Sequence, residues 1–236
     1  MFDIVFQNLD FMVINKHPNV SVHKDDGDTS LIAEMEASDT VELAAGQKLY
    51  LVHRLDKMTS GLLLLAKHQA AASELSKLFA ERNVSKFYLA IGVKKPKKKQ
   101  GLISGDMARS RRSSWKLLKT QENPAKTQFF SVAGDNGQRI FLCKPHTGKT
   151  HQIRVALNSI GSSILGDDIY TPSHPADRGY LHAFALYFDY QGQGYEFICD
   201  PTLGPVQGQA WQSDAMKNAM AEWQQPSQLP WPKINN

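Results

Sequence analysis

Apolar and polar residues alternate along much of the chain, and this two-residue period predicts β-strands that bury one face. The pattern predicts eight strands, at residues 2–6, 11–15, 61–67, 86–93, 127–133, 139–144, 180–187 and 195–199. A short apolar strand is also expected at residues 50–52. Residues 62–66 contain no polar side chain, which is typical of a strand buried on both faces.

Apolar residues spaced by three or four positions predict three helices. In residues 69–82 the apolar stripe consists of Ala72, Leu75, Leu78 and Phe79. The second helix is expected at residues 150–159. The third is expected at residues 214–224, with Ser213 as its N-cap and Pro226 beyond its end. Because strands outnumber helices and do not alternate with them regularly, we predict an α+β fold with a mixed, largely antiparallel sheet flanked by helices and loops.

The length of 236 residues and a hydrophobic content of 42% allow a substantial core. No clear linker divides the sequence, so we predict one domain over residues 1–236. Cys143 and Cys199 lie in apolar stretches without a CxxC spacing, which favours buried, reduced thiols. The first residues lack the features of a signal peptide, and no apolar run reaches the roughly 18 residues of a membrane span. We therefore expect a soluble, cytoplasmic protein.

The net charge of +4 hides an uneven distribution. Residues 94–119, the basic segment, contain ten basic side chains and one acidic one, and carry +9 while the rest of the chain carries −5. Concentrated cations with Trp115 among them suit RNA that has unstacked bases. RNA contacts are predicted from Lys97, Lys98, Lys99, Arg111 and Arg112. A solvated loop without a partner is the alternative, and residues 94–112 are predicted to be the least ordered part of the chain.

The most informative segment is residues 50–67, YLVHRLDKMTSGLLLLAK. Its polar cluster stands between the short apolar strand and the strand predicted to be buried on both faces. Asp56 is therefore expected in a turn between two core strands, where a carboxylate is rigid yet open to a ligand. Arg54 and Lys57 crowd this position, and cations within about 4–6 Å keep a carboxylate ionised.

Residues 53–67 resemble the HRLDxxTSGLLLLAK motif of the RluA-type RNA pseudouridine synthases, and the match is complete. The resemblance implies that Asp56 is catalytic, because the motif's Asp maps onto it. Residues 86–90 resemble the family's KxYxA motif, with its Tyr at Tyr88. Residues 144–170 resemble the third motif, commonly GRTHQIRVHL followed by ILGDxxY, and place the family's active-site basic residue at Arg154.

The resemblance covers about residues 3–200 and leaves about 207–236 as a C-terminal extension without a motif. Two positions of the third motif depart from the family pattern: Lys149 stands where Arg is usual, and Ala156 where His is usual. Lysine keeps the charge but loses the bidentate fork of arginine, so we expect an altered phosphate contact. The resemblance also implies the pseudouridine synthase fold, here without the small RNA-binding S4 module that many relatives carry in front.

Pseudouridine formation breaks the N1–C1′ bond of a uridine, rotates the base and joins C5 to C1′, so neither a cofactor nor a metal is expected. The resemblance implies that Asp56 attacks C1′ or stabilises charge there, and that Arg154 keeps Asp56 ionised. Tyr88 would stack on the extruded uracil and assist removal of the C5 proton. Whether Asp56 forms a covalent adduct or acts through a glycal-like intermediate stays open.

Further RNA contacts are expected beside Asp56. Arg54, two residues earlier in an extended segment, points the same way and, by the resemblance, fills the space left by the flipped base. His53 and Lys149 are also predicted to bind RNA, although structural hydrogen bonding is an alternative for His53. His53 has no third ligand at metal spacing, so no metal site is predicted.

Arg154 has two structural interpretations of its own. Its neighbours Ile153 and Val155 are apolar, so the side chain is either an ordinary surface cation or is drawn into the interior. An interior arginine needs a partner, because an unpaired buried charge is costly.

We predict a monomeric RNA-uridine isomerase acting on structured rRNA or tRNA, with no DNA or membrane partner. Two alternatives differ in chemistry. A non-catalytic RNA-binding protein with the same fold would bind RNA without isomerising it. Hydrolysis of a glycosidic bond would require a second acid for the leaving group, and the motif supplies none.

Overall fold

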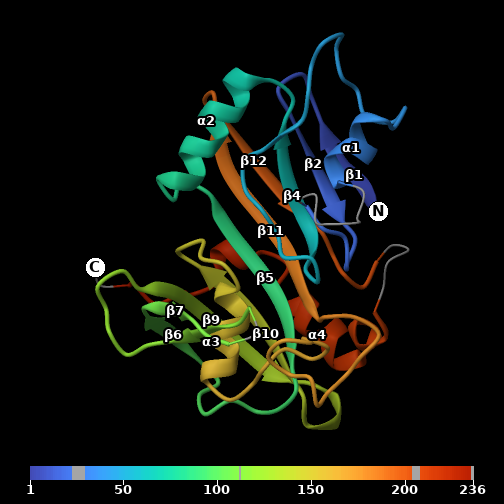
Figure 1. Ribbon diagram of the computed structural model, residues 1–236. Helices are drawn as coiled ribbons and strands as arrows, with labels where there is room; N and C mark the ends of the chain where they lie inside the picture. Colours follow the sequence, from blue (N-terminus) through green and yellow to red (C-terminus); the bar gives the residue numbers. More distant parts are fainter. Residues whose placement is uncertain (23–29, 112, 204–207, 235–236) are drawn as a thin grey trace. The chain divides into compact units, whose positions relative to one another are not determined.

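The computed structural model describes residues 1–22, 30–111, 113–203 and 208–234 (Figure 1). The chain forms two compact units, each described here by itself. Unit 1 comprises Met1–Val84 and Ala183–Cys199, and unit 2 comprises Ser85–His182 and Asp200–Asn236. The prediction of a single domain over residues 1–236 stays a prediction.

Unit 1 is built on antiparallel strands that surround one buried strand. The strands are β1 (Phe2–Gln7), β2 (Phe11–Lys16), β3 (Tyr50–Leu51), β4 (Ser60–Ala66), β11 (Leu181–Tyr190) and β12 (Gln193–Ile198). β2 pairs with β1 and β4, β3 pairs with the end of β4, and β12 pairs with β11. Every residue of β4 is buried, which confirms the interpretation of its unbroken apolar run.

Gly61 permits the close approach of β4 to its neighbour β11. A Cβ atom on Gly61 would lie 2.3 Å from the carbonyl oxygen of Ala183, and its φ of +103° is unfavourable for other residues. The start of β4 therefore requires glycine on both grounds.

Two helices belong to unit 1, α1 (Leu31–Glu36) and α2 (Gln69–Ala80). α2 packs on β3 and β4, and its buried residues include Ala72 and Leu75. His68 caps α2, because its ring accepts a hydrogen bond from the Ala71 amide at 3.2 Å.

Unit 2 contains a second set of antiparallel strands in the order β5 (Ser85–Gly92), β10 (Arg139–Pro145), β9 (Ala125–Ala133) and β6 (Gln100–Gly105). The short strands β7 (Met107–Arg109) and β8 (Trp115–Leu117) form a separate hairpin. The helices are α3 (Gln152–Ser159) and α4 (Asp214–Glu222), with 3₁₀ turns at Asp135–Gly137 (η1), Gln209–Gln212 (η2) and Pro226–Gln228 (η3). Gln152 of α3 reaches β9 by donating to the Thr127 hydroxyl at 3.0 Å.

The α+β fold with a largely antiparallel sheet is confirmed, as are the eight long strands, the short β3 and the three predicted helices. Ser213 is the N-cap of α4, since its hydroxyl accepts from the Met216 amide at 3.1 Å. Cys143 is a buried free thiol, whereas Cys199 is only half-buried. None of the helices in the described ranges is long and apolar enough to cross a membrane.

The prediction that residues 94–112 are the least ordered part of the chain is wrong for residues 100–109. β6 and β7 lie within this range, and β6 pairs with β9 along its whole length, from Gln100 opposite Phe130 to Gly105 opposite Ala125. Hydrogen bonds to β9 order β6, and the local sequence of β6 does not predict this pairing. The short α1 and β8 were likewise not predicted.

Candidate active site

Asp56 lies in the loop between β3 and β4, as predicted. Its side chain is half-buried, and its carbonyl accepts a hydrogen bond from the Thr59 amide at 3.0 Å, which closes a tight turn. Leu55 on one side and Thr59 on the other are buried. The turn is therefore anchored at both ends, which restricts the backbone that carries the Asp56 carboxylate.

Lys16, at the end of β2, contacts the backbone of this turn. The side chain is completely buried, and its ammonium group donates to the carbonyl oxygens of His17 at 2.9 Å, Val20 at 2.9 Å and Lys57 at 3.2 Å. Three acceptors match the three donors of an ammonium group, which is how a lysine becomes tolerable in an interior. The contact to Lys57 fixes the residue that follows Asp56. This role was not predicted, although a lysine ending an apolar strand is a visible signal.

His53 is held by the fold. Its Nε2 accepts a hydrogen bond from the Leu64 amide at 2.9 Å, and its ring stacks on Phe79 of α2 with the centroids 4.4 Å apart. These contacts agree with the alternative of structural hydrogen bonding, and RNA binding by His53 stays a prediction. Arg54, the next residue, is exposed.

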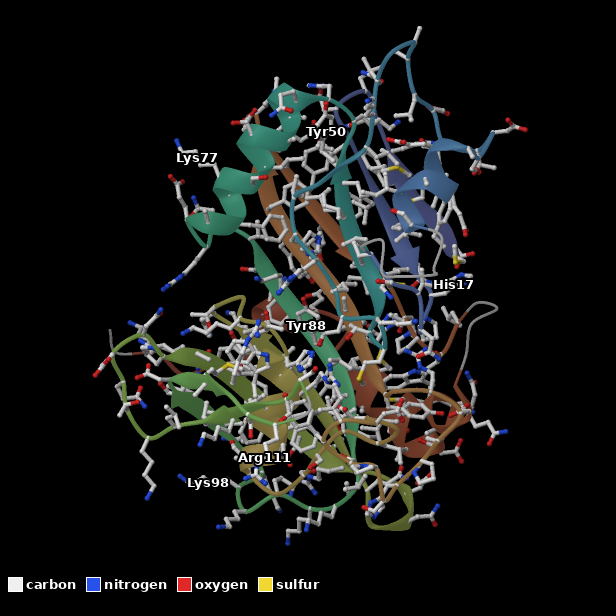
Figure 2. The ribbon with its side chains drawn as sticks, in the orientation of Figure 1. His17, Tyr50, Lys77, Tyr88, Lys98 and Arg111 are labelled. Carbon is white, nitrogen blue, oxygen red and sulfur yellow. The ribbon has the colours of Figure 1, made fainter. Side chains whose placement is uncertain are left out.

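Tyr88 lies on β5 of unit 2, opposite Cys143 of β10, and is labelled in Figure 2. It is half-buried, whereas its neighbours Phe87 and Leu89, which point to the other face of the strand, are fully buried. Lys86 shares the face of Tyr88, and burial lowers the pKa of its ammonium group.

Arg154 is buried in α3, which confirms the interpretation that its apolar neighbours draw it into the interior. It forms a bidentate ion pair with Asp167, with Nε 2.7 Å from Oδ2 and Nη2 2.8 Å from Oδ1. Asp167 is itself fully buried and accepts from the amides of Ile169 and Tyr170 at 3.0 and 3.1 Å. The guanidinium is therefore fixed, with its carbon 5.2 Å from the centre of the Tyr170 ring.

Asp167 was missed as a site residue. It lies in the ILGDDIY segment, and the sequence does not tell which of its two adjacent aspartates is buried. The pairing of Arg154 with Asp56, which the resemblance implies, stays a prediction.

Tyr170 connects α3 to the β7–β8 hairpin. Its hydroxyl accepts from the Trp115 amide at 2.8 Å and lies 3.1 Å from Nδ1 of His151. Trp115 in turn lies under the guanidinium of Arg109, which is 5.6 Å from the ring centre. This hairpin of the basic segment is thus attached to the helix that carries Arg154.

The other cations predicted to bind RNA fall into three groups. Lys97, Lys98, Lys99 and Arg111 are exposed on loops of unit 2, where Figure 2 labels Lys98 and Arg111. Lys149 is half-buried, and its ammonium group donates to the carbonyl of Asn123. Arg112 lies outside the described residues.

The one acid of the basic segment, Asp106, is used locally. Its carboxylate accepts from the amides of Glu122 and Asn123 at 3.0 and 2.8 Å. Hydrogen bonding, led by the Thr120 side chain, lowers the pKa of Asp106. In the described part of the chain, no three His, Cys, Asp or Glu side chains are grouped as a metal site would require.

Comparison with known proteins identifies the family. Residues 10–159 match a family model described as RNA pseudouridylate synthase. An uncharacterized RNA pseudouridine synthase of Haemophilus influenzae is 48% identical over 89% of this chain and 90% of its own length. The ribosomal large subunit pseudouridine synthase D of Zymomonas mobilis is 31% identical over 78% of this chain and 60% of its own length.

Solved structures agree with the sequence match. The human RNA pseudouridylate synthase domain containing 1 superimposes with a TM-score of 0.72 at 26% identity, covering 99% of this chain and 97% of that one. Human RNA pseudouridylate synthase domain containing 4, at 21% identity and a TM-score of 0.70, shares the fold. The predictions of a pseudouridine synthase fold and of an isomerase acting on RNA are confirmed. The chain belongs to the RluA-type RNA pseudouridylate synthase family.

Proposed function

We propose that this RNA pseudouridine synthase isomerises specific uridines of rRNA or tRNA with Asp56 as the catalytic carboxylate. The observation that carries the proposal is the anchored turn: Asp56 stands between β3 and the fully buried β4, and Lys16 holds the adjacent backbone. A group that acts on C1′ must be held within a fraction of an ångström of its productive position.

The reaction conserves all atoms of the uridine. The N1–C1′ bond breaks, with the carboxylate of Asp56 adding to C1′ or stabilising the charge that develops there. The base rotates and C5 bonds to C1′, which breaks the Asp56–C1′ bond if the carboxylate has added there. The C5 proton is lost while N1 gains one. The protein must therefore provide one fixed carboxylate, a surface for the extruded base and a route for a proton.

Tyr88 and Arg154 complete the proposed set. A half-buried phenol on a rigid strand presents a flat surface on which the extruded uracil stacks. The bidentate pair with Asp167 fixes the orientation of the Arg154 guanidinium. A fixed cation of this kind suits the role of keeping a catalytic carboxylate ionised.

RNA affinity is proposed to come mainly from phosphate contacts of the basic segment. Its exposed cations Lys97, Lys98, Lys99 and Arg111 support this, with Arg112 beyond the described residues. Arg54, His53 and Lys149 are proposed to contact RNA nearer to the target uridine. Because these contacts are electrostatic, binding is expected to weaken steeply with salt.

The choice of target follows the names of relatives. The Zymomonas mobilis relative is named for the ribosomal large subunit, so large-subunit rRNA is the first substrate to test and tRNA the second. We also propose that the protein is a monomer and that it acts in the cytoplasm, where both RNAs occur.

Tritium release from RNA labelled at uridine C5 tests the proposal. We expect release with the wild-type protein and with Asp39→Asn, an exposed aspartate in unit 1, but none with Asp56→Asn. RNA binding by Asp56→Asn should stay close to that of the wild type. Release by Asp56→Asn at the wild-type rate would refute the catalytic assignment. Binding without release by the wild type on rRNA and tRNA alike would instead favour a non-catalytic RNA-binding protein.

A further inference from the structure

Residues 226–234 form a strap in unit 2, outside the part of the chain that the family model matches. The strap begins with η3 and brings Trp231 onto the strands that precede and follow β10 in the sheet. The Trp231 ring centre is 4.4 Å from that of Phe130 on β9 and 5.8 Å from that of Phe87 on β5. The strap therefore covers the face of β5 opposite the face that carries Tyr88.

Lys144 of β10 is enclosed by the same ring contacts. Its ammonium nitrogen lies 5.5 Å from the centre of the Phe87 ring and 5.6 Å from the centre of the Trp231 ring. Cation–π attraction is strongest over tryptophan and increases when the cation is desolvated. Burial lowers the pKa of Lys144, in agreement with this enclosed position. β5, β10 and the strap are thus joined at one point.

Hydrogen bonds fix the strap at both ends of Trp231. The indole Nε1 donates to the carbonyl of Pro226 at 2.7 Å, which closes the strap on itself. The carbonyl of Pro232 accepts from Nε2 of Gln128, a buried residue of β9, at 2.6 Å. A buried side-chain amide whose nitrogen and oxygen are both hydrogen-bonded limits the movement of the groups it binds.

Gln128 also links the strap to the segment that precedes α3. Its Oε1 lies 2.8 Å from Nε2 of His146, in the segment that leads from β10 into α3. α3 carries Arg154. Two routes therefore start at the strap: one passes through Phe87 to Tyr88, and the other passes through Gln128 and His146 toward Arg154.

We propose that the strap is a positioning element that holds the Tyr88 face of β5 in its productive geometry, with Trp231 as its central residue. The inference rests on the proposed function of Tyr88 and adds to it a set of residues that never touch the RNA. β5 is a single strand whose two faces share one backbone, so loss of Trp231 on one face displaces Tyr88 on the other. A misplacement of about 1 Å costs on the order of 100-fold in rate.

Single-turnover kinetics of C5 tritium release test the strap. With Trp231→Ala we expect the rate constant at saturating RNA to fall by roughly tenfold or more, while the RNA concentration for half saturation stays unchanged. Trp231→Phe keeps an aromatic ring over Phe87 and should restore most of the rate. Gln128→Leu keeps the size but removes the links to Pro232 and His146, and should also lower the rate constant.

Met216→Ala is the matched control for stability. Met216 is fully buried in α4 of the same unit, so its truncation lowers the unfolding midpoint without removing any of the ring contacts and hydrogen bonds of Trp231 and Pro232 described above. A merely structural role for Trp231 predicts equal rates for the Met216 and Trp231 variants once both are folded. Wild-type rate constants in Trp231→Ala and Gln128→Leu would overturn the proposal.

A second measurement separates this inference from the proposed function. Fluorotyrosine incorporated throughout the protein gives one ¹⁹F resonance for Tyr88, assigned by its loss in Tyr88→Phe. We expect Trp231→Ala to shift or broaden this resonance and Met216→Ala to leave it unchanged. If the wild type isomerises no RNA, the proposed function fails, yet a resonance that responds only to Trp231 would still support positioning. A Tyr88 resonance that is unchanged in Trp231→Ala would refute the positioning role of the strap, even in an active enzyme.

Discussion

Single buried polar residues hold the proposed chemistry in place. Lys16 and Arg154 are both cations in the interior, and each is paired with acceptors: three carbonyls for the ammonium group, and one bidentate carboxylate for the guanidinium. A buried polar group costs free energy when it is left unpaired. Removing one member of such a pair should therefore lower the free energy of unfolding, even where neither member touches the substrate. The first prediction concerns Lys16.

Lys16→Met keeps the length of the side chain but leaves three carbonyls without their donor. We expect the free energy of unfolding to fall by about 2 to 3 kcal/mol, measured by urea denaturation. The loop of Asp56 should also lose its fixed geometry, so activity per folded molecule should fall. Lys48→Met, at an exposed position of the same unit, should change the unfolding free energy by no more than about 0.5 kcal/mol. Equal effects of the two substitutions would contradict the assigned role of Lys16.

Strand packing explains why a glycine stands at the start of β4. Gly61 meets the Ala183 carbonyl of β11, whereas Gly46 has a comparable positive φ of +82° but open space around it. Comparing substitutions at the two glycines therefore distinguishes the cost of a positive φ from the cost of steric overlap. The overlap at Gly61 involves main-chain atoms, which cannot swing aside as a flexible side chain does.

Gly61→Ala and Gly46→Ala form a matched pair. Both substitutions place alanine at a positive φ, which costs about 1–2 kcal/mol. Only Gly61→Ala also forces β4 away from β11, so its loss of unfolding free energy should exceed that of Gly46→Ala by at least about 2 kcal/mol. Thermal denaturation of the two variants checks this. Similar midpoints would show that β4 and β11 separate easily.

The sequence predicts an element well where the local hydrophobic pattern alone determines it. It predicts an element poorly where pairing with a strand or side chain remote in sequence determines it. The apolar run of β4 and the stripe of α2 are local signals, and both elements lie where expected. β6 escaped prediction because its order comes from pairing with β9, which is remote in sequence. The same holds within the site: Asp56 is visible in a motif, but the partner of Arg154 is a choice between Asp167 and Asp168 that only packing makes.

At the scale of the whole molecule, the distribution of charge matters more than its sum. The net charge of +4 is modest, yet the basic segment alone carries +9. The remainder carries −5, so the proposed association with RNA is expected to favour the basic segment. The β7–β8 hairpin belongs to this segment and is attached through Tyr170 to α3, so RNA bound there is expected to lie near the helix of Arg154.

Charge reversal of Lys97, Lys98 and Lys99 to Glu tests this organisation. Removing one lysine–phosphate pair reduces the slope of log K against log salt by about 0.7 to 0.9, so a reduction of about 2 is expected if all three lysines bind phosphate. Affinity should fall at low salt and converge with the wild type at high salt, as measured by fluorescence anisotropy with rRNA fragments. Reversal of Lys48, Lys77 and Lys217, which are exposed outside the basic segment, changes the net charge equally and serves as the control. If both triple variants lose the same affinity, RNA responds to net charge alone, and the basic segment has no special role. If only the first variant loses affinity and both unfold like the wild type, binding is local to the segment.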